Sequence, residues 1–251
     1  MTETTIRRFG QGPLSRASAL VYTLLVVELL VLATTLPGLV GLVLLDRDAA
    51  NVPLAAVCAL PAGPALSAAL YALHRRRLDL TDLHPASAFW RGYRMNVRGV
   101  LTLYVPWLAW LTVLGTTLAN FGAAGVPGWW AALLVVVALA SALWGANALM
   151  ITSLFAFRAR DVARLAAYFL FSTPRVALGN ACLVVVAGGV TLVATEAALT
   201  LLGSVFASAL LLNSRPLIAE VTEKFTLQGG AAQGGAAQAE AARGVSPEAA
   251  S

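Results

Sequence analysis

Two polar side chains, Glu28 and Asn147, stand deep inside apolar stretches of this sequence. Glu28 follows Ala19, where one apolar run begins, by nine residues, and Asn147 precedes Phe157, where another ends, by ten. If both runs cross a membrane, the two side chains lie at similar depth and form a candidate intramembrane polar pair. A carboxyl group at that depth is either a working proton or ligand site or part of a structural hydrogen bond with the amide. The sequence leaves both interpretations open.

The composition indicates which elements must position this pair. Hydrophobic residues make up 59% of the 251 residues, whereas ordinary soluble domains contain about 45–50%. Charged residues make up 12%, and the mean hydropathy is +0.79. These values predict an all-α fold, a polytopic transmembrane helical bundle.

Apolar runs of sufficient length predict about six spans within a membrane domain over residues 19–225. The predicted spans are residues 19–45, 52–73, 100–122, 129–157, 176–195 and 197–213. The last two divide a 37-residue run at Glu196, because that run is too long for one crossing. Five spans, or a re-entrant hairpin, are the alternatives. Residues 1–18 form a polar arm, and residues 226–251 form a low-complexity tail that we expect to be disordered.

The basic residues predict the orientation. Sixteen of the 17 Lys and Arg residues fall in segments that alternation places on one side of the membrane, and Arg47 alone falls on the other. Cytoplasmic loops carry such an excess of positive charge. We therefore expect both termini to lie in the cytoplasm, with the block Arg75, Arg76 and Arg77 fixing the second span.

Residues 86–98 predict an interfacial helix with two faces. At 100° per residue, three arginines fall on one face and aromatic side chains fall on another. The arginines are Arg91, Arg94 and Arg98, and the aromatic residues are Phe89, Trp90 and Tyr93. Such a helix either binds anionic lipid headgroups or docks a protein partner, and the two roles are compatible.

Prolines predict two further features. Pro61 and Pro64 lie inside the second span and predict a kink near Ala62, either in a tightly packed helix or as a hinge. A second short helix is expected over residues 161–175, with Asp161 as its N-cap and Pro174 as its stop.

Enzyme chemistry is poorly represented in the chain. Cys58 and Cys182 have no second ligand at metal-binding spacing, and His74 and His84 fall in one basic loop. No motif of a common enzyme class is present. We expect no catalytic residue, no cofactor, no metal and no nucleic-acid partner.

Three short sequence pieces carry a resemblance to a known family. The pieces are Leu60-Pro61 followed by small residues and Ala69-Leu70-Tyr71, then the stretch from Phe89 to Asn96, and then Ser172-Thr173-Pro174-Arg175. In this order the chain resembles the YesL family of bacterial integral membrane proteins over nearly all of residues 10–220. The resemblance implies a location in the bacterial cytoplasmic membrane and an association with carbohydrate ABC transporters. No biochemical activity is assigned to that family.

These observations favour a non-catalytic accessory or regulatory partner of a carbohydrate ABC-transport system. Its partners would be transporter subunits and the anionic headgroups of the bilayer. A small secondary transporter is the alternative, because Glu28 and Asn147 supply polar groups at the membrane interior.

Overall fold

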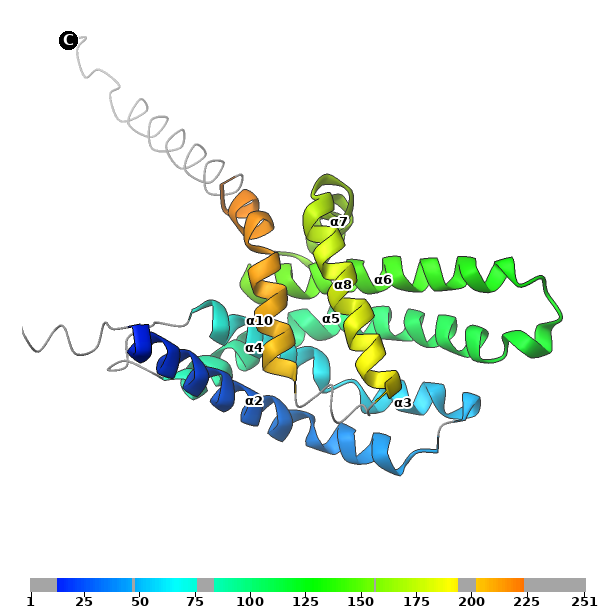
Figure 1. Ribbon diagram of the computed structural model, residues 1–251, viewed down its shortest axis with the longest axis horizontal. Coiled ribbons are helices and arrows are strands. Elements are labelled where there is room, and N and C mark those ends of the chain that lie inside the picture. The colour runs from blue at the N-terminus through cyan, green and yellow to red at the C-terminus, as the bar shows by residue number, and fades with distance from the viewer. Residues whose placement is uncertain (1–12, 47, 76–83, 156, 194–201, 224–251) are drawn as a thin grey trace, which may run out of the picture. The chain divides into compact units, whose positions relative to one another are not determined.

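The computed structural model describes residues 13–46, 48–75, 84–155, 157–193 and 202–223, and the regular elements of these residues are all helices. The chain divides into two compact units, residues 1–213 and residues 214–251. In the second unit, residues 215–223 are helical. The rest of this subsection concerns the first unit (Figure 1).

The first unit contains eight α-helices among its described residues. They are α2 (Pro13–Leu44), α3 (Val52–Cys58), α4 (Ala62–His74), α5 (Pro85–Ala119), α6 (Trp129–Leu154), α7 (Ala159–Ser172), α8 (Pro174–Val193) and α10 (Gly203–Asn213). Two short 3-10 helices, η1 (Ala49–Asn51) and η3 (Phe121–Ala124), lie in the turns after α2 and α5. The all-helical prediction is therefore confirmed for these residues.

Four of these helices are long and apolar enough to cross a membrane, which indicates a multi-pass membrane protein. The qualifying segments are Ala17–Leu44, Pro85–Ala119, Trp129–Leu154 and Pro174–Thr191. The 3-10 turn and α3, taken with α4, form a fifth candidate that is bent by 43°. Helix α10 has 11 residues. At 1.5 Å per residue that is about 16 Å, against a hydrocarbon core of about 30 Å. Six spans are thus not confirmed, and Glu196 lies outside the described residues.

Helix α5 joins two elements that the sequence analysis separated. The expected interfacial helix over residues 86–98 and the expected span over residues 100–122 form one helix from Pro85 to Ala119. Gly99 is the residue between them, and a single exposed glycine weakens a helix by only about 1 kcal/mol relative to alanine. Without a proline at this junction, the backbone hydrogen bonds continue. The arginines therefore extend directly from a membrane-capable helix.

Helix α7 also differs in detail from the expected element. Its N-cap is Arg158, and Asp161 lies in the first helical turn, where its negative charge still complements the helix dipole. The helix ends at Ser172, two residues before Pro174, as expected, and Pro174 is also the first residue of α8. Proline is tolerated there because the first helical N–H groups need no intrahelical acceptor.

Helix α4 is the most buried element and contacts α2, α5, α6 and α10. Small residues allow these helices to approach closely, as is common where lipid surrounds the bundle. A Cβ atom on Gly63 would lie 2.7 Å from the ring of Tyr104, and one on Gly92 would lie 2.7 Å from the ring of Tyr71. Close contact between α4 and α5 therefore depends on a glycine from each helix.

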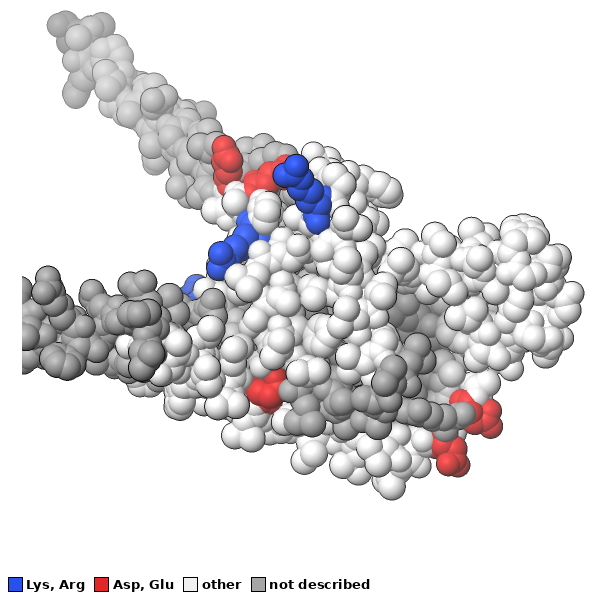
Figure 2. Space-filling view, viewed as in Figure 1, with Lys and Arg blue, Asp and Glu red and all other residues white. Residues whose placement is uncertain are grey.

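Helices α5 and α6 run antiparallel, side by side, and are joined by a turn in which Gly125 has a φ of 61° (Figure 1). From Gly99 to Phe157 the sequence has no Asp, Glu, Lys or Arg. Figure 2 shows the part of the right-hand side that α5 and α6 form in white, with acidic side chains below it.

Charged residues gather at the opposite ends of the same helices. The described arginines of the first unit lie at the start of α2, after the C-terminal end of α4, in the first half of α5, after α6, in α7 and at the start of α8. Side-chain hydrogen bonds bring these ends together, since Asn96 of α5 donates to the backbone oxygen of Ser153 near the end of α6. Asp46 and Asp48 lie in the turn after α2.

Candidate functional site

Glu28 of α2 is half-buried, and its carboxylate lies at the N-terminus of α10. Its Oε2 atom accepts the backbone N–H of Ser204 at 2.6 Å. The first N–H groups of a helix lack intrahelical partners, and the positive end of the helix dipole favours an acidic group. The Oε1 atom is buried, and no described residue donates a hydrogen bond to it. Glu28 therefore combines a helix-capping contact with a buried oxygen atom that has no donor among the described residues.

Asn147 of α6 is buried and belongs to a different cluster, an asparagine ladder with Asn180 and Asn213. Asn180 Nδ2 donates to Asn147 Oδ1 at 3.0 Å, and Asn213 Nδ2 donates to Asn180 Oδ1 at 2.7 Å. Asn213 Nδ2 also donates to the backbone oxygen of Val176 at 2.9 Å. The ladder ties α6, α8 and α10 together. Glu28 and Asn147 thus have different hydrogen-bond partners, and the structure does not bring them together as a pair.

Asn180 and Asn213 are residues that the sequence reasoning missed. Asn180 lies within the apolar run of residues 176–212 and Asn213 directly follows it, so their amides were detectable as polar groups in an apolar segment. Amide side chains buried between membrane helices form hydrogen bonds across them. The sequence could therefore have marked both asparagines as candidates, but not their bonds to each other and to Asn147.

A third polar cluster joins α4, α5 and α6. The Ser153 hydroxyl donates to Ser67 Oγ at 2.9 Å, and Asn96 Nδ2 donates to the backbone oxygen of Ser153 at 3.0 Å. Ser67 and Ser153 are buried. Because the partners of these groups are other parts of the bundle, the cluster holds the helices together rather than facing a ligand.

The proline pair lies at the break between α3 and α4. Pro61 is the residue before α4, Pro64 lies in its first turn, and the axis bends by 43° there. The Tyr104 hydroxyl donates to the backbone oxygen of Ala59 within the break at 3.2 Å. The bend occurs where the prolines predict it, and movement about it as a hinge stays a prediction.

The three arginines of α5, hereafter the arginine face, are Arg91, Arg94 and Arg98. All three are exposed, and none forms an ion pair with a described residue. The aromatic side chains next to them do not share one environment. Phe89 is 0% exposed and belongs to the core, whereas Trp90 is 44% exposed. Both pack against Tyr93, with ring centroids 6.4 Å and 5.7 Å away. Phe89 therefore anchors this part of α5, and the arginine face points away from the bundle.

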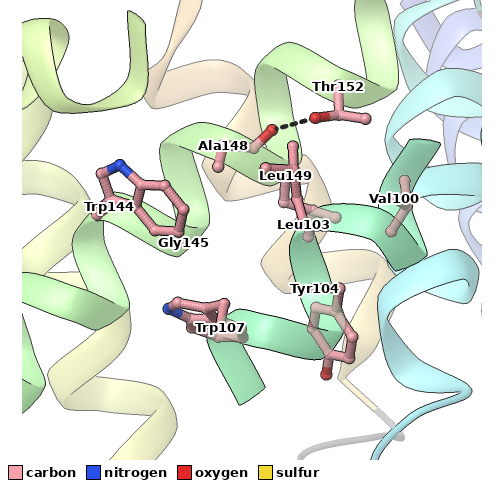
Figure 3. Close-up of a pocket in the computed structure, with 9 residues that line it drawn as sticks. All are labelled: Val100, Leu103, Tyr104, Trp107, Trp144, Gly145, Ala148, Leu149 and Thr152. Atoms are coloured by element: carbon pink, nitrogen blue, oxygen red, sulfur yellow. Dashed lines mark hydrogen bonds between the residues drawn. The ribbon is translucent and has the colours of Figure 1, made fainter. Parts of the chain in front are cut away.

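Helices α5 and α6 enclose one small cavity of about 20 Å³ next to a larger open groove of about 530 Å³. Figure 3 shows Trp107 of α5 and Trp144 of α6 at the cavity, together with Gly145. A side chain at Gly145 would overlap the Trp107 indole. The α5–α6 groove itself is lined from α5 by Thr102, Leu103, Pro106, Trp107 and Trp110, and from α6 by Val137, Ala140, Ser141 and Trp144.

The described residues contain no group of three or more His, Cys, Asp and Glu side chains that could hold a metal ion. Cys58 is partly buried and Cys182 is exposed, and both are free thiols. His74 ends α4 and His84 precedes α5, so the two histidines flank the same segment.

Comparison with known proteins gives no assignment. No model of a protein family matches the chain, and no curated protein and no solved structure matches it either. The resemblance to the YesL family therefore stays a prediction that rests on the three sequence pieces.

Proposed function

We propose that the protein is a non-catalytic accessory or regulatory partner of a carbohydrate ABC-transport system in the bacterial cytoplasmic membrane. The observation that carries the proposal is the arginine face: three exposed guanidinium groups, without ion-pair partners among the described residues, on a helix anchored by Phe89. Charged surfaces of this kind steer and orient protein partners and attract anionic lipids. The carbohydrate transport system as the partner rests on the resemblance alone.

Two of the buried polar clusters support a non-catalytic role. The asparagine ladder and the cluster around Ser153 use their hydrogen bonds within the bundle. Groups that already stabilise helix contacts are poorly suited to bind a substrate.

The orientation that docking requires places the arginine face and both termini in the cytoplasm. Reporter fusions test it: fusions at Asn51 and Gly125 should report the outside, and a fusion at Asp161 should report the cytoplasm. A fusion at Glu196 distinguishes six spans, with an outside signal, from five spans or a re-entrant hairpin.

Affinity capture tests the docking role. We expect the tagged protein, solubilised in a mild detergent, to retain ABC-transporter subunits. A variant with Gln at Arg91, Arg94 and Arg98 should lose them, because the face would no longer carry charge. A matched variant with Gln at Arg158, Arg160 and Arg164, which are exposed arginines around the start of α7, should keep them. Equal recovery of subunits with both triple variants would contradict docking through α5.

Glu28 supports a second candidate function, a small secondary transporter. Its buried Oε1 has no described hydrogen-bond donor, and the N-terminus of a short helix lies beside its other oxygen. Transporters place ligand sites at the N-termini of half-helices near the bilayer midplane. Proteoliposomes that contain the protein alone would then show proton-coupled solute uptake that Glu28→Gln abolishes. Absence of uptake together with recovery of transporter subunits would favour the accessory role.

A further inference from the structure

The α5–α6 groove is a candidate binding surface whose indole N–H groups already bond to acceptors within the protein. Trp107 Nε1 donates to the backbone oxygen of Ser141 at 2.8 Å, and Trp110 Nε1 donates to Ser141 Oγ at 3.1 Å. Trp144 Nε1 donates to the backbone oxygen of Ala163 at 3.1 Å, and the Thr102 hydroxyl donates to that of Arg98 at 2.8 Å. All three indole donors and the Thr102 hydroxyl along the wall thus have an acceptor within the protein, and Ser141 Oγ accepts one of these bonds.

A surface whose indole donors are already satisfied suits an occupant that needs few hydrogen bonds. No charged residue occurs in the chain between Gly99 and Phe157, so the groove cannot bind an ionic group along its length. Its volume, about 530 Å³, falls within the range of about 300–1,000 Å³ that is typical of small-molecule sites. A sugar would leave its hydroxyl groups without partners here, whereas a hydrocarbon chain would not.

The end of the groove that begins at Thr102 adjoins the arginine face. Arg98 precedes Thr102 by one helical turn and is only about 40° away from it around α5 at 3.6 residues per turn. Arg94 lies one turn further out. From Arg98 to Trp110 the helix rises by about 18 Å, close to the half-thickness of a hydrocarbon core of about 30 Å. Arg94 and Arg98 at headgroup level and the apolar α5–α6 groove therefore lie within the same leaflet of the bilayer.

We propose that the α5–α6 groove binds one acyl chain of an anionic phospholipid whose phosphate is held by Arg98 and Arg94. The indoles of Trp107 and Trp110, fixed by their bonds to Ser141, form the rigid wall against which the chain packs. This inference rests on the membrane location of the bundle and not on the accessory role, so either can fail without the other.

Fluorescence quenching by brominated lipids tests the proposal, because bromine on an acyl chain quenches an indole that it contacts. The probes are phosphatidylglycerol and phosphatidylcholine with the same dibrominated chains, each diluted into unbrominated phosphatidylcholine vesicles that contain the full chain. A reporter variant keeps only the three groove tryptophans, with Phe at Trp90, Trp129 and Trp130. The relative binding constant is obtained from the quenching at equal mole fractions of the two brominated lipids. It should favour phosphatidylglycerol over phosphatidylcholine about five-fold for each arginine that contacts the phosphate, because about 1 kcal/mol corresponds to that factor.

Two pairs of variants separate the headgroup from the chain. Arg98→Gln should lower the preference for phosphatidylglycerol about five-fold, and Arg175→Gln, an exposed arginine at the start of α8, should leave it unchanged. Ala140→Phe fills the groove and should reduce quenching by both lipids. Ala132→Phe, at an exposed position of α6 outside the groove, should not. Far-ultraviolet circular dichroism and size-exclusion chromatography verify that each variant is folded.

Three outcomes would overturn the proposal. Equal quenching by the two lipids in the reporter variant would mean that no anionic lipid is selected. Unchanged quenching in Ala140→Phe would mean that the chain lies elsewhere. If Ala140→Phe instead dissociates an oligomer, as measured by light scattering, the groove holds a helix of a second copy.

Discussion

Removing the central amide of the asparagine ladder should measurably destabilise the bundle. In Asn180→Leu the number and branching of the side-chain heavy atoms are conserved, but the bonds to Asn147 and Asn213 are lost. Asn147 is 2% exposed and would keep an unpaired amide oxygen, which typically costs about 1–3 kcal/mol. Asn213 keeps its bond to the backbone oxygen of Val176. We therefore expect Asn180→Leu to lower the free energy of unfolding by about 1–3 kcal/mol.

A double-mutant cycle isolates the interaction between the two buried amides. The variants are Asn147→Leu, Asn180→Leu and their combination, unfolded reversibly by titration with sodium dodecyl sulfate in mixed micelles and followed by circular dichroism. Interhelical hydrogen bonds in membranes contribute about 0.6 kcal/mol on average and at most about 1.7 kcal/mol. The double variant should therefore lose less stability than the two single variants together by that amount. The control is Asn120→Leu, at an exposed asparagine after α5 whose side-chain amide donates to the backbone oxygen of Thr116.

Strict additivity would refute this reasoning. If the double variant equals the two single losses to within about 0.3 kcal/mol, the amides are energetically independent and their 3.0 Å contact does not stabilise the bundle. A loss in Asn120→Leu as large as that in Asn180→Leu would likewise show that the effect belongs to the substitution and not to the ladder.

Four further substitutions test three other contacts by the same unfolding titration. Glu28→Gln keeps an acceptor for the N-terminus of α10 and should remain near wild-type stability. Glu28→Leu removes it and should cost about 0.5–2 kcal/mol, as loss of a helix cap does; equal stability of the two variants would contradict the capping contact. Gly145→Ala forces a methyl group against the Trp107 ring and should cost about 1–3 kcal/mol, with a changed fluorescence spectrum as a second readout. Tyr104→Phe removes the hydrogen bond to Ala59 and should cost about 0.6 kcal/mol; a loss above 2 kcal/mol would indicate a packing role for the hydroxyl.

The sequence was most informative where a signal extends over many residues. Hydropathy predicted the helical class and the positions of the long helices, because a membrane-capable run must keep its apolar character over about 20 residues. The bend between α3 and α4 was predictable for a local reason, since Pro61 and Pro64 remove backbone donors within one turn.

Other features depend on contacts between distant segments and were not predictable. Matching depths suggested that Glu28 meets Asn147, but depth does not fix the direction in which a side chain points around its helix. Ser204 and Asn180 occupy those directions instead. The continuity of α5 through Gly99 was missed because a change in polarity was interpreted as a change of element. Polarity and helix continuity are independent properties of the chain.

The asparagine ladder also sets an order of events during biosynthesis. Asn180 follows Asn147 by 33 positions, and Asn213 follows Asn180 by another 33. At synthesis rates of about 5–20 residues per second, Asn180 is synthesised about 2–7 seconds after Asn147, and Asn213 follows after a similar interval. During that interval α6 exposes a polar group to lipid or to the insertion machinery. A nascent chain that stops before Asn180 therefore presents an unsatisfied amide within the bilayer, a feature by which membrane proteases and chaperones can distinguish an unfinished molecule from a complete one.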